Sequence, residues 1–562
     1  MLRDNLRIQL GDYRPLLDDA FAELRDENVV ERIYDGDHRL WKSTPEEVAD
    51  RLGWVESPRA MLNEAKRFQR FTDSVLEEGF THALLLGMGG SSLAPHVVSS
   101  ILGCRSGYVN LDVLDSTDPA MVLSHSRRLE PAKTLFLVST KSGTTVETVS
   151  LFKYFYNWLS SSVGKERTGR HFVAITDPAS PLEEKARRYG FRDIFLNDPA
   201  IGGRYSALSC FGLVPASLIG ADIRFILNRA LQERNFRRGD PEFSTGIVLG
   251  ALLGALARAG RDKMTLVTSP QIASFGDWVE QLIAESTGKE GKGILPVVGE
   301  QIGDPDVYGT DRLFIYLCLE WDRNREDERM SQLSEAGHPV IYLYLKDLYD
   351  VGRQFFLWEL ATAVAGYFLR VNPFDQPDVE AAKVRTREII DGRRKKGRPA
   401  SDGPDFSAGG VSVFGYGGDD PAAILSEFLD GAADGAYVSL HAYVKQTPEM
   451  DSALAGLRAK IRDTRRVATT VGYGPRFLHS TGQLHKGDGG AGLFVQITAE
   501  DLLDVPIPDE AGLSSSSTTF GVLKAAQAEG DRKVLADRGR QVIRFHFQED
   551  VPGGIEALAA SL

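Results

Sequence analysis

"TLFLVSTKSGTTVETVSLFKYFYNWLSS", residues 134–161, contains the turn that decides how this chain folds. It starts as a short apolar run (134–139) and continues, from Thr145 onward, as a long amphipathic segment. Between them, residues 140–145 hold four hydroxyl side chains, one lysine and one glycine. A short apolar run followed at once by a helical pattern predicts a strand, a tight turn and a helix.

The same rhythm of short apolar runs and helical patterns recurs on both sides of this stretch. Five such runs are predicted to be strands: 82–88, 110–115, 134–139, 171–176 and 193–197. A second group follows at 263–269, 312–319 and 339–345. Apolar strands that alternate with helices are typical of parallel sheets covered on both faces. The predicted fold class is therefore α/β, with two doubly wound parallel-sheet domains.

Composition and helical patterning suggest five parts. They are a helical N-terminal arm (1–60), a first α/β domain (61–220), a second α/β domain (221–392), a flexible linker or loop (393–410) and a C-terminal α/β region (411–562). The last part holds four further strand patterns. They either extend the second sheet or form a third layer, and the sequence leaves both open. "SSSSTTF" (514–520) predicts a Ser/Thr-capped helix start.

The charge balance argues against a general nucleic-acid or membrane binder. The 562 residues carry 78 acidic and 65 basic side chains, a net charge of −13. The basic "RRKKGR" (393–398) is expected to be a solvated helix end. No apolar stretch is long enough to span a membrane, and the first residues lack a signal-peptide core.

The three cysteines, Cys104, Cys210 and Cys318, have neither metal-ligand nor redox spacing. Small core residues of this kind suit a reducing cytoplasm, which is the expected location.

The hydroxyl-rich turn is a candidate anion site. In open α/β sheets, ligands bind at the carboxyl ends of the strands, where helix N-termini expose backbone N–H groups. Thr140, Ser142 and Thr145 can each donate an O–H, and Lys141 adds a positive charge. The alternative is a helix-capping cluster without a ligand.

A second turn, "GMGGSSLAP" (87–95), follows the first predicted strand and adds Gly90 and Ser91. Neither turn matches a Walker loop or a dinucleotide fingerprint. A small phosphate compound is therefore the expected ligand, rather than a nucleotide.

These two turns, taken with four later motifs, resemble the phosphoglucose isomerase family of the sugar isomerase domain superfamily. The later motifs are "GGRYSALSCFGL" (202–213), "QLIAESTGK" (281–289), "NPFDQPDVEAAK" (372–383) and "HSTGQL" (479–484). The resemblance implies flavodoxin-like α/β/α sandwiches. It also implies the reversible interconversion of glucose 6-phosphate and fructose 6-phosphate, in glycolysis and gluconeogenesis, through ring opening and a cis-enediolate. This chemistry requires no metal or cofactor.

The resemblance assigns the proton transfer to Glu285 and the stabilisation of the enediolate to Arg204. Gln281 lies four residues before Glu285, on the same face of a predicted helix. Gly203 leaves space around the Arg204 guanidinium, which stays charged and donates hydrogen bonds as a planar fork.

Ring opening falls to His479 and Lys383, and the resemblance gives Glu147 the role of orienting the histidine. Imidazole titrates near neutrality and can pass a proton in either direction. Lys383 follows Gln376 by seven residues, which places both on one face of a helix. His485 competes for the histidine role but lies outside the matched position.

The order of the motifs departs from that of most family members, because His479 follows Lys383 by about 100 residues. This order resembles the isomerase half of transaldolase–phosphoglucose isomerase fusions, although no transaldolase barrel precedes residue 1. The family tends to supply the histidine from the second subunit of a homodimer, whereas a rearranged C-terminal region could supply it within one chain. Two other functions remain open: an isomerase that also accepts mannose 6-phosphate, and a phosphosugar-sensing protein without catalysis.

Overall fold

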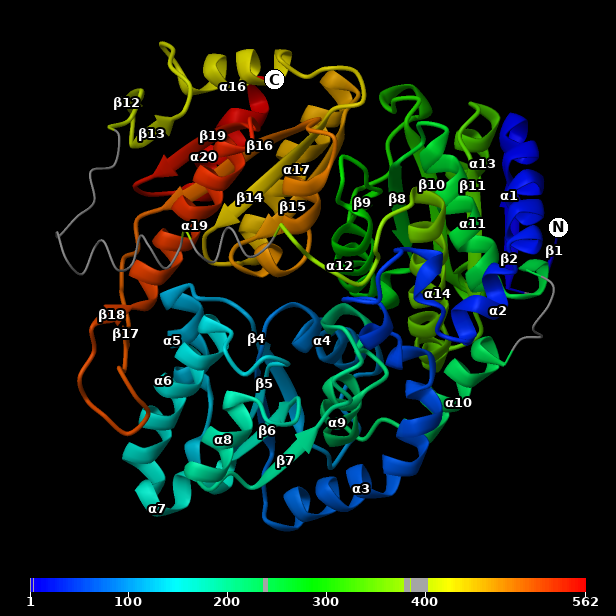
Figure 1. Ribbon diagram of the computed structural model, residues 1–562. Coiled ribbons are helices and arrows are strands. Elements are labelled where there is room, and N and C mark those ends of the chain that lie inside the picture. The colour runs from blue at the N-terminus through cyan, green and yellow to red at the C-terminus, as the bar shows by residue number, and fades with distance from the viewer. Residues whose placement is uncertain (1, 4, 236–240, 379–384, 386–402) are drawn as a thin grey trace.

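The computed structural model describes all residues except 1, 4, 236–240, 379–384 and 386–402. Three large sheets, each flanked by helices, organise the chain. In Figure 1 the first sheet lies at the bottom, the second at the upper right and the third at the upper left. The third sheet has its own strands and its own core, so the C-terminal region forms a third layered unit and does not extend the second sheet.

The first sheet has five parallel strands in the order β4-β3-β5-β6-β7. They are β3 (His82–Leu86), β4 (Asn110–Leu114), β5 (Thr134–Ser139), β6 (Phe172–Thr176) and β7 (Asp193–Leu196). All five strands predicted for this part of the chain are confirmed. The order reverses between β3 and β5, and such a switch point opens a crevice at the carboxyl ends of the strands.

Alternate residues of these strands face opposite sides, and each side buries a different set of helices. One face packs against α3 (Ser57–Glu77), α4 (Leu93–Leu102) and α9 (Cys210–Leu218). The other face packs against α5 (Pro119–Arg128), α6 (Val146–Val163) and α8 (Pro181–Arg188). A sheet covered on both faces explains why its strands read as continuous apolar runs.

The second sheet has the order β1-β2-β11-β10-β8-β9. Its parallel strands are β8 (Lys263–Thr268), β9 (Leu295–Val298), β10 (Arg312–Leu319) and β11 (Val340–Leu345). The helices of this unit are α10 (Ile223–Arg234), α11 (Thr245–Arg258), α12 (Phe275–Thr287), α13 (Asp327–Glu335) and α14 (Val351–Leu369). One continuous apolar core joins this sheet to the helices on one face of the first sheet.

The N-terminal arm is not wholly helical, so that prediction is wrong in part. β1 (Leu2–Arg3) and β2 (Leu6–Gln9) precede α1 (Arg14–Asp26) and α2 (Val29–Tyr34). β2 pairs antiparallel with β11 and covers the edge of the second sheet. The strand is only four residues long, with one fully buried residue, so its apolar pattern is too short to recognise.

The third sheet has the order β12-β13-β19-β16-β14-β15. Its strands are β12 (Phe406–Ala408), β13 (Val411–Phe414), β14 (Tyr437–Tyr443), β15 (Ala468–Tyr473), β16 (Gly492–Ala499) and β19 (Gln541–Phe547). Its helices are α16 (Pro421–Asp430), α17 (Pro448–Arg465), α18 (Gly482–Gly487), α19 (Phe520–Asp537) and α20 (Val551–Ala560). Thr519 caps α19 by accepting the N–H of Val522, as predicted for this Ser/Thr-rich stretch. Of the predicted linker, residues 393–402 lie outside the described residues, and β12 occupies part of the remainder.

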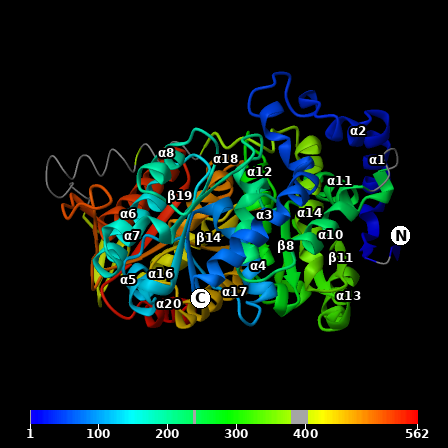
Figure 2. The ribbon, with the colours of Figure 1, turned by 90° about the horizontal axis from the view of Figure 1, so that it is seen from below.

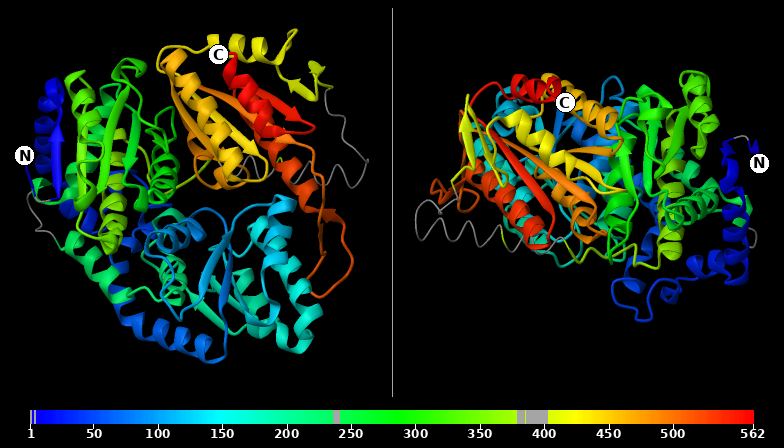
Figure 3. Two further views of the ribbon diagram at one scale, coloured as in Figure 1. Left: turned by 180° about the vertical axis from the view of Figure 1, so that it is seen from behind. Right: turned by 90° about the horizontal axis from the view of Figure 1, so that it is seen from above.

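The C-terminal region contacts both other units. α18 lies beside α12 of the second unit (Figure 2). A loop between β17 (Pro506–Ile507) and β18 (Thr518–Thr519) runs down along α6, on the outside of the first unit (Figure 3). There the Asn157 side chain donates to the carbonyl of Leu513 at 2.6 Å and accepts from the N–H of Gly512 at 2.6 Å.

Two further findings concern membrane-spanning helices and the burial of the cysteines. Within the described ranges, no helix is both long and apolar enough to cross a membrane. Cys210 and Cys318 are buried as expected, but Cys104 is exposed, so the prediction of three core cysteines is wrong for that one.

Candidate active site

Two turns of the first unit and the C-terminal half of α12 build the floor of the candidate site. Residues 140–145 connect β5 to α6, and residues 87–92 connect β3 to α4. Both turns therefore lie at the carboxyl ends of neighbouring parallel strands, as predicted. Ser139, at the end of β5, donates its hydroxyl to the carbonyl of Ser91 at 3.0 Å, so the two turns contact each other.

Gly90 allows a third segment to pack onto this floor. A Cβ placed on Gly90 would lie 2.0 Å from the carbonyl oxygen of Gly203, which no side chain could tolerate. Gly203 begins the single-turn helix Gly203–Tyr205, which carries Arg204. The glycine at position 90 is thus required to bring the arginine over the first sheet.

Glu285 and Arg204 form a buried ion pair in the centre of the site. The Arg204 Nη1 lies 3.1 Å from the Glu285 Oε1, and the two side chains are 2% and 12% exposed. Gln281, one turn earlier on α12, donates from Nε2 to the Glu285 Oε2 at 3.0 Å. The same nitrogen donates to the carbonyl of His479 at 2.8 Å. The predicted i, i+4 relation of Gln281 and Glu285 is confirmed, and Gln281 links the carboxylate to the histidine segment.

Arg204 also ties the loop after α14 to the site. Its guanidinium donates to the Ser286 Oγ at 2.7 Å and to the Gln376 Oε1 at 2.9 Å. It further donates to the carbonyls of Pro373 at 2.7 Å and Asp375 at 2.8 Å. The planar fork of an arginine is suited to this many acceptors. Gln376 is thereby brought beside Arg204, whereas Lys383, the other residue predicted from this motif, lies outside the described residues.

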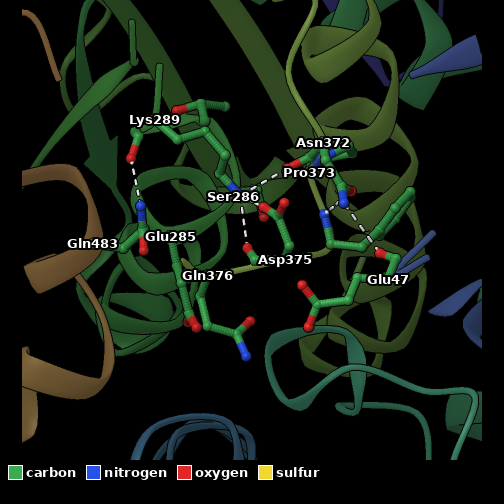
Figure 4. Close-up of polar contacts among 12 residues, drawn as sticks. Glu47, Glu285, Ser286, Lys289, Asn372, Pro373, Asp375, Gln376 and Gln483 are labelled. Carbon is green, nitrogen blue, oxygen red and sulfur yellow. Dashed lines mark hydrogen bonds and ion pairs between the residues drawn. The ribbon is translucent and has the colours of Figure 1, made fainter. Parts of the chain in front are cut away.

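Lys289 holds the same loop and was not identified as a site residue from the sequence. Its Nζ donates to the carbonyls of Asn372 at 2.7 Å and Asp375 at 2.6 Å, and to the Asp375 carboxylate at 2.7 Å. Figure 4 shows Lys289 and the loop 372–376 around Glu285, with Gln483 beside Lys289. Burial, reinforced by the neighbouring Arg204 cation, lowers the pKa of Lys289 to about 8. Lys289 is the last residue of the motif at 281–289, so the motif itself could have marked it as a site residue.

His479 and Glu147 come together from the third and first units. His479 ends the single-turn helix Arg476–His479, and its Nε2 lies 2.8 Å from the Glu147 Oε1 at the start of α6. Both residues belong to the same chain. The contact also includes Gln527 of α19, which donates to the same carboxylate oxygen at 2.6 Å. Gln527 was not predicted, since it lies in an ordinary helical stretch and no local motif marks it.

His485, the competing histidine, lies in the core of the C-terminal unit. It is 1% exposed and packs against the rings of His441 and Phe494 at 4.8 and 5.2 Å between centroids. Burial lowers its pKa well below the usual value. A histidine enclosed in this way does not contact the Glu147 carboxylate, which favours His479.

The hydroxyl turn has its side chains paired with one another. The Oγ1 atoms of Thr140 and Thr145 lie 2.9 Å apart, and the Ser142 Oγ lies 3.0 Å from the Thr144 Oγ1. Lys141 is hydrogen bonded to the Asp177 carboxylate and, at 2.9 Å, to the carbonyl of Pro199. Burial raises the pKa of Asp177 in spite of this pairing. Lys141 is therefore committed to an internal partner, whereas Ser142 is exposed at the turn.

The turn also requires a glycine. Gly143 has φ +68°, and a Cβ there would lie 2.5 Å from the backbone nitrogen of Leu182. This close approach of α8 fixes the height of the turn above the sheet.

Fold and site together define a class: a doubly wound α/β protein that holds a carboxylate, a guanidinium and a histidine–carboxylate pair over hydroxyl-bearing strand ends. Comparison with known proteins then gives the family. The family model for phosphoglucose isomerase matches residues 66–295. A glucose-6-phosphate isomerase of Thermus thermophilus is 31% identical, in an alignment that covers 61% of this chain and 90% of that protein. The chain belongs to the phosphoglucose isomerase family.

Other relatives agree. The glucose-6-phosphate isomerase of Carboxydothermus hydrogenoformans is 30% identical over 60% of this chain and 85% of its own length. A crystal structure of a hypothetical protein from Thermus thermophilus superposes with a TM-score of 0.59 at 26% identity, over 68% of this chain and 99% of that one. A Chlamydia trachomatis glucose-6-phosphate isomerase, at 18% identity, has the same fold with a TM-score of 0.56, over 68% of this chain and 87% of that one.

Proposed function

We propose that this protein is a glucose-6-phosphate isomerase, which interconverts glucose 6-phosphate and fructose 6-phosphate reversibly. The observation that carries the proposal is the meeting of Glu285, Arg204 and the His479–Glu147 pair at the strand ends, in a chain of this family. A sensor that only binds phosphosugars would have no use for a buried carboxylate held between an arginine and a glutamine.

The proton transfer is assigned to Glu285. With an open-chain sugar bound, its carboxylate removes the proton from C2 of the aldose and delivers it to C1. The proton of the C2 hydroxyl moves to the oxygen on C1, so the ketose forms with no net gain or loss of protons. The intermediate is a cis-enediolate, whose negative charge develops on oxygen. Arg204 is fixed by four neighbours besides Glu285 and stays charged, so it is preorganised to stabilise that oxygen.

The opening of the sugar ring is assigned to His479, with Glu147 orienting it. A carboxylate only accepts hydrogen bonds, so the imidazole hydrogen lies on Nε2 and Nδ1 is left for the substrate. Nδ1 exchanges a proton with the sugar hydroxyl and ring oxygen as the ring opens. Lys383 remains a predicted partner in this step.

The phosphate group is assigned to the two turns, with Ser91, Thr140, Ser142 and Thr145 as donors and the N-terminus of α6 behind them. Lys141 contributes mainly by holding the turn to Asp177.

Because His479 reaches Glu147 of its own chain, we further propose that the site is complete in one subunit, in line with the motif order of transaldolase fusions. A phosphorylated metabolite and three unpaired cysteines favour the cytoplasm. Mannose 6-phosphate is a second substrate to test.

The test is to add fructose 6-phosphate to pure protein with a chelator present and to follow glucose 6-phosphate through a coupled dehydrogenase. Glu285→Gln should lower kcat by about a hundredfold or more, the scale of general-base catalysis. Glu290→Gln, an exposed change five residues later, is the matched control and should behave as wild type. No turnover, with fructose 6-phosphate still raising the melting temperature, would refute the isomerase and favour the sensor.

A further inference from the structure

A buried chain of hydrogen bonds runs behind the histidine–carboxylate pair. The Thr117 hydroxyl donates to the Gln527 Oε1 at 2.9 Å. The Gln527 Nε2 donates to the Glu147 Oε1 at 2.6 Å, and the same oxygen lies 2.8 Å from the His479 Nε2. Thr117, Gln527 and Glu147 are 0%, 2% and 3% exposed, so water does not compete for these bonds.

The direction of each bond in this chain is determined by chemistry. An amide has one oxygen that accepts and one nitrogen that donates, and Gln527 has one partner for each. The Glu147 carboxylate only accepts, so the NH₂ group of Gln527 must face it, and the amide oxygen is left to accept from the Thr117 hydroxyl. The Glu147 carboxylate then receives two N–H donors on a single oxygen, one from the amide and one from the imidazole. This arrangement favours an ionised carboxylate in a fixed orientation, which in turn fixes the plane of the imidazole ring.

The helix that carries Gln527 is anchored on both sides of this contact. Lys524, three residues earlier, pairs with Asp118 of the first unit at 2.8 Å. Asp531, four residues later, accepts from the Lys486 Nζ at 2.7 Å, and Lys486 lies on α18, which follows His479. Positions 524, 527 and 531 share one face of a helix. α19 therefore fixes the segment bearing His479 relative to the unit bearing Glu147.

We propose that Gln527, held in place by Thr117, is a positioning residue that aligns the Glu147–His479 pair for opening of the sugar ring. This inference rests on the proposed isomerase function and adds to it a residue of the C-terminal region. Gln527 is 2% exposed and its side chain bonds to Thr117 and Glu147, so it acts through Glu147. Loss of Gln527 should therefore impair ring opening and leave the C1/C2 proton transfer machinery intact.

The test separates the two steps by measuring them on the same protein samples. Exchange between the anomers of fructose 6-phosphate requires ring opening alone, and 13C magnetisation transfer measures it. Gln527→Leu should lower kcat for isomerisation by about ten- to a hundredfold, the scale of misplacing a catalytic group, with KM within about threefold. Catalysed anomer exchange should fall by a similar factor. Glu285→Gln, in contrast, should lower kcat for isomerisation by about a hundredfold or more and keep anomer exchange.

Thr117 supplies a second test with a conservative rescue. Thr117→Val removes the hydroxyl that orients the amide and should reduce anomer exchange, whereas Thr117→Ser retains the hydroxyl and should keep it. Gln527→Glu keeps the size of the side chain but opposes two carboxylates. Its activity should be low at pH 8 and recover as the pH falls, since a protonated carboxyl can donate as the amide does.

Normal anomer exchange in Gln527→Leu and Thr117→Val, with wild type active as an isomerase, would overturn the proposal. So would a loss of isomerisation in Gln527→Leu without a loss of anomer exchange. If wild type itself does not isomerise fructose 6-phosphate, the proposed function fails instead, so the two failures are distinguishable.

Discussion

Replacement of Arg204 by lysine tests how much this one side chain contributes to both stability and rate. The guanidinium contacts five acceptors: Ser286 Oγ, Gln376 Oε1, Glu285 Oε1 and the carbonyls of Pro373 and Asp375. An ammonium group has three N–H donors and no planar fork, so at least two of these contacts are lost. A buried hydrogen bond to a charged group contributes about 1.5–3 kcal/mol, so Arg204→Lys should lower the free energy of unfolding by about 3–6 kcal/mol.

The rate should also fall, because the lysine keeps a positive charge but not the geometry. Loss of one positioned donor at a developing oxyanion costs about 10²–10³ in kcat. Urea unfolding followed by tryptophan fluorescence measures the first effect, and the coupled isomerase assay measures the second. Arg39→Lys is the control, since the Arg39 side chain is 71% exposed and contacts only Asp37 among the pairs described. Its urea midpoint and kcat should equal those of wild type.

A variant Arg204→Lys with the wild-type urea midpoint and a kcat within tenfold of wild type would refute this reasoning. That result would mean that water or a shifted backbone replaces the lost donors. The loop 373–376 would then owe its position to Lys289 and to the packing of Phe374 against Trp41 and Tyr205.

Three further predictions follow from single contacts. Gly90→Ala should lower the free energy of unfolding by about 1–3 kcal/mol, because the added Cβ would lie 2.0 Å from the Gly203 carbonyl oxygen. Gly203→Ala is the control: its Cβ would have no atom within 4 Å, so the melting temperature should stay unchanged. The pKa of Lys289 is lowered to about 8 from 10.5, so the unfolded chain binds more protons between these pH values. The free energy of unfolding of wild type relative to Lys289→Met should therefore rise by about 3 kcal/mol between pH 8 and 10.5 in urea titrations; a constant difference would contradict this sign. Asn157→Ala removes both bonds that hold the loop at 512–513, so limited proteolysis there should accelerate while kcat stays at the wild-type value; equal cleavage rates would show that the loop is held elsewhere.

The five strands of the first sheet and β8, β10 and β11 of the second could be predicted because parallel strands buried on both faces give apolar runs that stand out from their surroundings. The turns at 87–95 and 140–145 could be placed at strand ends for the same reason. β2, β9 and β12 were missed because strands of three or four residues have little apolar pattern. β15 was missed because threonines and a glycine interrupt its apolar residues. Gln281 and Glu285 were placed correctly relative to each other by helical periodicity, whereas Lys289 of the same motif and Gln527 were missed.

The amino-acid pattern alone establishes the local elements, the fold class and the residue types available for catalysis. Which of these residues meet follows only from the packing of the units. Glu147 and His479 are 332 positions apart, and Thr117 and Gln527 are 410 positions apart, yet each pair is joined within one buried network. Lys141, which the sequence offered as a phosphate ligand, has an internal partner in Asp177 that the sequence did not indicate. Hydrophobic periodicity and helix or strand propensity depend on residues that are close in the sequence. The partner of a buried polar side chain depends on which helices and strands pack together, and this packing depends on the whole core.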